Sequence, residues 1–195
     1  MSSADIIAAL RLGGLAFMVG LSGAMSPGPY LTVTITRTLR DGRLSAALML
    51  VGHALLEGAL LVGFAFGLQE FLKRPTVANG LALIGGAVLI WMGYGLMKGA
   101  VTGTIAADLE AAEDTSRMGP VLHGVVVSLS NPYWTLWWAT VGVVLAAEGL
   151  AIGPIGIVAF FIGHQLADWV WYGFVILAVS SGRHLLSGIV YRSVI

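Results

Sequence analysis

Cysteine is absent from this chain of 195 residues, which excludes disulfides and thiolate metal sites. Charge is scarce as well: only 10% of the residues are charged, and ten basic side chains balance ten acidic ones. That balance gives no reason to expect nucleic acid as a partner. The first residues lack the basic stretch and small-residue cleavage site of a secretory signal peptide, so we predict no cleaved leader.

Hydrophobic residues make up 57% of the chain, and the mean hydropathy is +0.90. This composition is typical of an integral membrane protein in a lipid bilayer. We predict an all-α bundle of five to six spans, since each crossing takes roughly 20 apolar residues. The expected spans run from about Ile6 or Leu12 to Leu39, from Leu44 to Leu68, from Val77 to Met97, from Pro120 to Ala147 and, after a tight turn at Glu148–Gly153, from Pro154 to about Ser180.

Two of these spans contain proline at an internal position. The first carries Ser26-Pro27-Gly28-Pro29-Tyr30, and the fourth carries Asn131-Pro132-Tyr133-Trp134. Proline removes a backbone donor, so we expect each helix to stop and restart, with Ser26 and Asn131 as N-caps and Pro27 and Pro132 at the first helical position. Such breaks are tolerated at mid-membrane only where protein or a water-filled cavity covers them. The restarted half-helices would present their positive ends to an anionic group of a substrate, whereas the simpler alternative is a kink in a packed helix.

A second pattern recurs in the two halves. Gly52-His53-Ala54-Leu55-Leu56-Glu57 corresponds to Gly163-His164-Gln165-Leu166-Ala167-Asp168. Three spans separate the copies, and because this number is odd the second copy should be inverted in the membrane. We therefore predict two inverted three-helix repeats, residues 1–97 and 120–195, joined by an acidic cytoplasmic connector at 98–119. Inverted repeats with discontinuous helices are typical of secondary transporters.

Histidine and acid are four residues apart in each copy, so each pair shares one helix face. Ionisable groups at membrane depth are costly and mark proton or ion pathways, and we assign proton coupling to His53, Glu57, His164 and Asp168. Three alternatives stay open: a purely structural hydrogen bond within each pair, a zinc or nickel site made from both pairs, and acid–base catalysis. Catalysis is disfavoured because no nucleophile lies beside the pairs, so we expect no enzyme and no cofactor.

Tryptophan is concentrated after the second proline break. Trp134 and Trp138 fall on one helix face, where they would either line a cavity or belong to an interfacial aromatic belt. The candidate substrate-binding residues are therefore Ser26, Pro27, Gly28, Pro29, Tyr30, Asn131, Pro132, Trp134 and Trp138.

The distribution of basic residues predicts the orientation. Lys73 and Arg74, with Arg11 as an uncertain third, fall on one side, whereas the other side collects a larger group: Arg37, Arg40, Arg43, Lys98, Arg117, Arg183 and Arg192. Because basic residues favour the cytoplasmic side, we expect the N-terminus outside.

The Ser-Pro-Gly-Pro segment at 26–29 and the Asn-Pro segment followed by tryptophans at 131–138 resemble the LysE/RhtB family of amino-acid exporters. The similarity extends over nearly the whole chain and includes the order of the spans and the acidic loop after the third. The resemblance implies export of amino acids or related small solutes from the cytoplasm across the plasma membrane, driven by the proton gradient. By it, Pro27, Gly28, Pro29, Asn131 and Pro132 are motif positions.

One departure from the family pattern concerns the sixth span. Family members usually have six, and here too few residues follow Gly182-Arg183-His184 to cross a bilayer. We expect either a shortened chain or a partner subunit that fills the gap, and a homodimer is one such arrangement.

Overall fold

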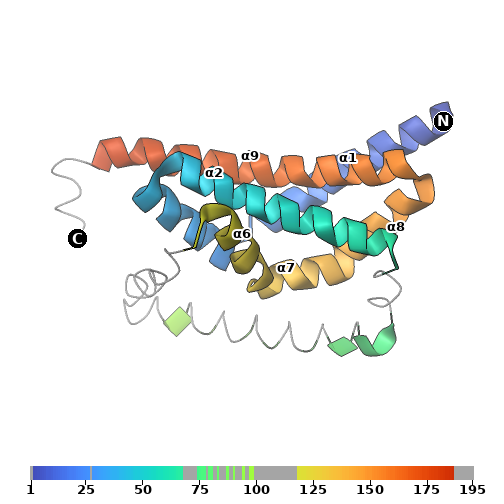
Figure 1. The fold of residues 1–195 in the computed structure, drawn as a ribbon, viewed down its shortest axis with the longest axis horizontal. Coiled ribbons are helices and arrows are strands. Elements are labelled where there is room, and N and C mark those ends of the chain that lie inside the picture. The colour runs from blue at the N-terminus through green and yellow to red at the C-terminus, as the bar shows by residue number, and fades with distance from the viewer. Residues whose placement is uncertain are drawn as a thin grey trace.

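The computed structural model describes residues 2–26, 28–67 and 118–186, with a few positions between 74 and 98. Every regular element in these residues is a helix, as predicted (Figure 1). The predictions for the third span, for the connector after it and for a sixth span fall wholly or mostly outside the described residues. The elements are α1 (Ser3–Ala24), α2 (Pro29–Ala65), α6 (Pro120–Leu129), α7 (Pro132–Trp137), the π-helix η2 (Trp138–Gly142), α8 (Val143–Ile152) and α9 (Pro154–Leu186).

The chain is interrupted between α1 and α2 and then reverses its direction inside α2. Helix α1 begins at a capping box in which Ser2 and Asp5 each satisfy the other's backbone N–H. It ends at Ala24, and α2 begins at Pro29. Inside α2 the chain turns at Gly42, whose φ of 83° is favourable only for glycine. The part of α2 after Gly42 therefore runs back along the part before it.

The second half repeats this order of elements. Helix α6 ends at Leu129 and α7 begins at Pro132, where the Asn131 side chain accepts a hydrogen bond from the Tyr133 N–H. After η2 and α8, Gly153 with a φ of 102° reverses the chain into α9. In Figure 1 the segment from α6 to α8 runs opposite to the segment from α1 to Gly42, and α9 lies along α1.

Two local predictions were wrong. The N-cap of the first restart is Gly28 with Pro29 at the first helical position, rather than Ser26 with Pro27. Ser26 still belongs to the end of α1, because its N–H bonds back to the Gly23 carbonyl and its hydroxyl lies 3.4 Å from the Ser22 carbonyl oxygen. The tight turn expected at Glu148–Gly153 is confined to Gly153, since α8 stays helical as far as Ile152.

Glycine sets the closest approaches between the two halves. A Cβ atom on Gly52 of α2 would collide with the backbone carbonyl of Val121 in α6, and one on Gly124 of α6 would collide with that of Met49 in α2. The contact of α9 with α1 is built in the same way, because a Cβ on Gly163 would collide with the carbonyl of Gly13. Small residues that let helix backbones touch are characteristic of helix packing in lipid.

Three described stretches are long and apolar enough to cross a membrane: Ser3–Ala24, Pro29–Ala65 and Pro132–Ile152. Many of their large apolar side chains point outward, as for Leu10 and Leu44, each more than two-thirds exposed in the isolated chain. Inside, one cluster of buried side chains surrounds Trp138 and Phe160, and a second surrounds Tyr30 and Tyr172. The helices thus have a largely apolar outer surface, and a set of polar side chains that includes His53, Glu57, His164 and Asp168 is buried between them.

Candidate functional site

A pocket lies where the two helix interruptions approach each other. Ala24 and Tyr30, which flank the first interruption, line it from one side, and Asn131 and Tyr133 line it from the other. A Cβ placed on Gly28 would lie 4.0 Å from the Asn131 amide oxygen, so the two interruptions are neighbours in space. The remaining lining residues are Gly20, Gly23, His53, Glu57, Trp134, Trp137, Trp138, His164, Asp168 and Tyr172.

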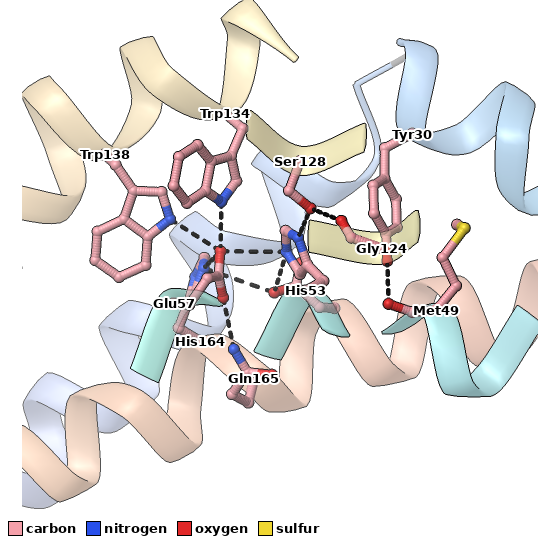
Figure 2. A network of polar contacts seen from close by, with 11 residues as sticks. Tyr30, Met49, His53, Glu57, Gly124, Ser128, Trp134, Trp138, His164 and Gln165 are labelled. Carbon is pink, nitrogen blue, oxygen red and sulfur yellow. Dashed lines mark hydrogen bonds and ion pairs between the residues drawn. The ribbon is translucent and has the colours of Figure 1, made fainter. Parts of the chain in front are cut away.

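Glu57 is the centre of a hydrogen-bond network in this pocket (Figure 2). Its Oε1 accepts from the indole N–H groups of Trp134 and Trp138, both at 2.9 Å. Its Oε2 lies 2.5 Å from the Gln165 side-chain nitrogen. The indole N–H has no acceptor role and the Gln165 amide nitrogen donates, so these partners match a carboxylate rather than a carboxylic acid. Glu57 is only 1% exposed and is therefore a buried anion held by neutral donors.

The two ring nitrogens of His53 have different partners: Nδ1 contacts Ser128, and Nε2 faces the carboxyl groups. The Ser128 hydroxyl lies 2.7 Å from His53 Nδ1 and gives its own proton to the Gly124 carbonyl, also at 2.7 Å. With the serine proton on that carbonyl, Ser128 accepts from His53, and we assign the Nδ1–H tautomer on this basis. The Nε2 atom of the same ring lies 3.2 Å from Glu57 Oε1 and 3.6 Å from Asp168 Oδ2. With Nδ1 protonated, Nε2 faces the oxygens of two carboxyl groups, a position suited to a shared proton or another cation.

His164 and Asp168 complete the cluster from α9. His164 Nε2 lies 3.2 Å from Glu57 Oε1 and 3.6 Å from Asp168 Oδ2. Within the described part of the chain, His164 Nδ1 and Asp168 Oδ2 have no hydrogen-bond partner although both are buried. The two carboxylates therefore differ: Glu57 accepts from three side-chain donors, whereas among the described residues Asp168 has only the histidine contacts. His53, Glu57 and Asp168 offer ligand atoms within 4.8 Å of one another and could hold a metal ion.

Aromatic rings enclose the charged groups. The ring of Trp137 stacks on that of His164 with centroids 4.4 Å apart, and Tyr30 tilts against His53 at 4.8 Å. Tyr30 in turn meets Tyr172 edge to face at 5.0 Å and donates its hydroxyl proton to the Met49 carbonyl. These rings restrict water around the cluster, which strengthens the electrostatic interactions inside it.

The structure brings the proposed proton-coupling residues His53, Glu57, His164 and Asp168 into one cluster. Of the proposed substrate-binding residues, Tyr30, Asn131, Trp134 and Trp138 line the same pocket. Ser26, Gly28, Pro29 and Pro132 stand at the interruptions but are not among the lining residues, and Pro27 is outside the described residues.

Sequence reasoning missed several groups of the site, namely Gln165, Ser128, Trp137 and Tyr172. Gln165 had a signal: it is a polar residue inside an apolar helix, next to His164. Ser128 had none, because serine is common in transmembrane helices and its role depends on the crossing of α6 and α2.

A separate polar contact joins the two halves away from this pocket. Arg37 of α2, which is 7% exposed, contacts His123 of α6 through its guanidinium. Its Nε also lies 2.7 Å from the Ser45 hydroxyl and 3.4 Å from the Asp41 carboxylate. None of these four side chains lines the pocket.

Long apolar helices with a buried charged pocket at their interruptions are typical of multi-pass membrane proteins that carry small solutes. The family model described as LysE type translocator matches residues 21–195, and the chain belongs to this family. It is accordingly a membrane transporter of small solutes rather than an enzyme. Comparisons with curated proteins and with solved structures found no match.

Proposed function

We propose that this protein exports amino acids or related small solutes from the cytoplasm across the plasma membrane, in exchange for protons. One observation carries the proposal: each half of the chain contributes one histidine and one carboxylate to a single buried cluster in the pocket. Buried ionisable groups at membrane depth are costly, and a cluster that joins two halves is suited to a carrier whose halves move.

An inverted repeat accounts for the arrangement, with residues 1–97 and 120–195 as the two units and 98–119 as the connector. Four features recur at the same interval in the sequence: the positive-φ glycines 42 and 153, the close-contact glycines 52 and 163, the histidines and the acids. The contacts between the units correspond as well. Helix α1 of the first unit packs on α9 of the second, and α6, the counterpart of α1, packs on α2, the counterpart of α9. Both interruptions then lie within the membrane near the axis that relates the units.

The pocket suits a zwitterionic solute. Its carboxylate would lie at the N-terminal ends of the restarted helices at Gly28–Pro29 and Asn131–Pro132, where backbone N–H groups lack helical partners. Its ammonium group would lie against Asp168, because the Oδ2 atom of this residue has no hydrogen-bond partner among the described residues. The indole and phenol rings around the cluster add cation–π attraction for the same ammonium.

Proton exchange is linked to the contacts between the halves. His53 Nε2 faces two carboxylate oxygens only while α2 and α9 are together, and the proton between them is held by all three groups. If the units rock apart, His53 and Glu57 separate from His164 and Asp168, and the shared proton loses its Asp168 partner while it keeps Glu57. Alternating access and the weaker binding of the proton would thus be one movement.

The orientation and assembly belong to the same proposal. Gly42 would lie at the cytoplasmic face and Gly153 at the outer face, with the N-terminus outside. A homodimer would supply apolar surface beside α9.

The test is transport by the purified protein in proteoliposomes with an imposed pH gradient, using a panel of amino acids and divalent metal ions. We expect uphill flux of at least one amino acid that collapses with the gradient. Flux of a metal ion without any amino-acid flux would favour the alternative of a metal exporter, and flux indifferent to the gradient would refute proton exchange. His123→Gln is the matched control, because it removes a buried histidine outside the pocket.

A further inference from the structure

The four ligand atoms of the charged cluster alternate nitrogen and oxygen around a closed ring. The sides of this ring, from His53 to Glu57 to His164 to Asp168 and back, measure 3.2, 3.2, 3.6 and 3.6 Å. Ligands bound tetrahedrally to zinc at roughly 2.0–2.1 Å lie about 3.3 Å from one another. The four sides lie near this value, and three of the four residues, His53, Glu57 and Asp168, offer ligand atoms that all lie within 4.8 Å of one another.

Donor chemistry and charge point the same way. Two imidazole nitrogens and two carboxylate oxygens are a donor set suited to zinc, cobalt and nickel. In each helix the two ligands are four residues apart, the spacing that places two metal ligands on one helix face. With the proton of His53 assigned to Nδ1, the Nε2 lone pair is directed at the oxygens of two carboxyl groups, a position suited to a bound cation.

Two of the four side chains, His53 and Glu57, have the hydrogen-bond partners that orient metal ligands. Ligating histidines commonly donate their second ring N–H to a fixed acceptor, as His53 does to Ser128. Ligating carboxylates are themselves hydrogen-bonded, as Glu57 is to Trp134 and Trp138. Asp168 is 4% exposed, and its Oδ2 has no hydrogen-bond partner among the described residues, so this atom is available for an ion.

We propose that His53, Glu57, His164 and Asp168 form a binding site for one divalent first-row transition-metal ion. The ion takes the position otherwise held by the proton between His53 and the carboxylates and thereby ties α2 to α9. A transporter with its halves tied together cannot alternate, so such an ion blocks solute export. The binding itself does not depend on the exported solute and is measured without transport.

The probe is Co²⁺, followed by Zn²⁺ competition, added to the purified full chain in detergent without a polyhistidine tag. We expect saturable visible absorption typical of Co²⁺ with nitrogen and oxygen ligands, one ion per chain by calorimetry, and displacement by Zn²⁺. The ion should also raise the thermal unfolding temperature, because it binds the folded state.

Variants separate this site from adventitious binding. His53→Gln and Asp168→Asn should abolish the absorption, and Ser128→Ala should weaken affinity by about 10–100-fold through loss of the orienting hydrogen bond. His123→Gln should bind like the wild type, because His123 contacts Arg37 outside the pocket. Absence of saturable binding to the wild type, or equal binding by folded Asp168→Asn, would overturn the proposal.

Discussion

Replacement of Glu57 by glutamine removes one buried charge and leaves the shape of the side chain unchanged. The hydrogen bonds from Trp134 and Trp138 are retained if the new amide oxygen occupies the Oε1 position. The new NH₂ group would then face the Gln165 amide nitrogen, a donor against a donor. Gln165 resolves this conflict by turning its amide, because its own oxygen has no partner among the described residues and is free to accept.

The expected change in stability can be worked out from these contacts. Three hydrogen bonds fall from the charged class, about 1.5–3 kcal/mol each, to the neutral class, about 0.5–1.5 kcal/mol each, a total loss of about 3–4.5 kcal/mol. The buried charge, whose desolvation costs several kcal/mol, disappears at the same time. We therefore expect the free energy of unfolding of Glu57→Gln to lie within about 2 kcal/mol of the wild type, while proton-driven export is lost.

Glu57→Ala provides the comparison. It leaves three buried donors unsatisfied at about 1–3 kcal/mol each and also creates a cavity, so it should unfold far more easily than Glu57→Gln. Thermal unfolding and uphill flux are measured on the same preparations. If Glu57→Gln exports normally, or if it is as unstable as Glu57→Ala, the account of this network is wrong.

Other predictions rest on the same contacts. Asp168→Asn should abolish uphill export with stability kept or raised, because it removes a buried charge that has few donors; normal export would exclude Asp168 from coupling. Gly52→Ala should lower the free energy of unfolding by about 3 kcal/mol or more, because its Cβ meets the backbone of α6. Gly173→Ala has open space around it and should raise the free energy of unfolding by about 0.5–1 kcal/mol. Unfolding curves that rank the two variants otherwise would refute the crossing geometry of α2 and α6. Cysteine at Arg43 should be labelled only from the cytoplasm and cysteine at Glu148 only from outside; the reverse labelling would invert the proposed orientation.

The helix interruptions could be predicted because proline acts locally. At Asn131–Pro132 the cap and the first helical residue were both correct, since one capping residue precedes one proline. At Pro27-Gly28-Pro29 two prolines each satisfy the rule for a first helical position, and the sequence offers no local way to choose. The choice of Pro29 accompanies a tertiary contact, because Tyr30 is buried and donates to the Met49 carbonyl.

The π-helix at Trp138–Gly142 was not predicted, and its cause is packing rather than propensity. A Cβ on Gly142 would lie only 2.6 Å from the ring of Trp138, so the widened turn and the missing side chain make room for the indole. That indole then points its N–H at Glu57. Tertiary packing decides which donors reach the Glu57 carboxylate, so these donors could not be predicted from the sequence. The histidine and acid pairs could be predicted, because they form a repeated pattern in it.

The repeated motif gives two unequal pairs. In the first half, His53 is fixed by Ser128 and Glu57 is saturated by indole and amide donors, so neither can change partners without loss of hydrogen bonds. In the second half, His164 Nδ1 and Asp168 Oδ2 have no hydrogen-bond partner among the described residues. The difference arises from the crossing helices: α6 presents a serine to His53, whereas α1 presents Gly20, where a Cβ would come within 2.8 Å of His164 Nδ1. We infer that the first pair is the fixed side of the cluster and that the second pair is the side that moves away from the shared proton or ion.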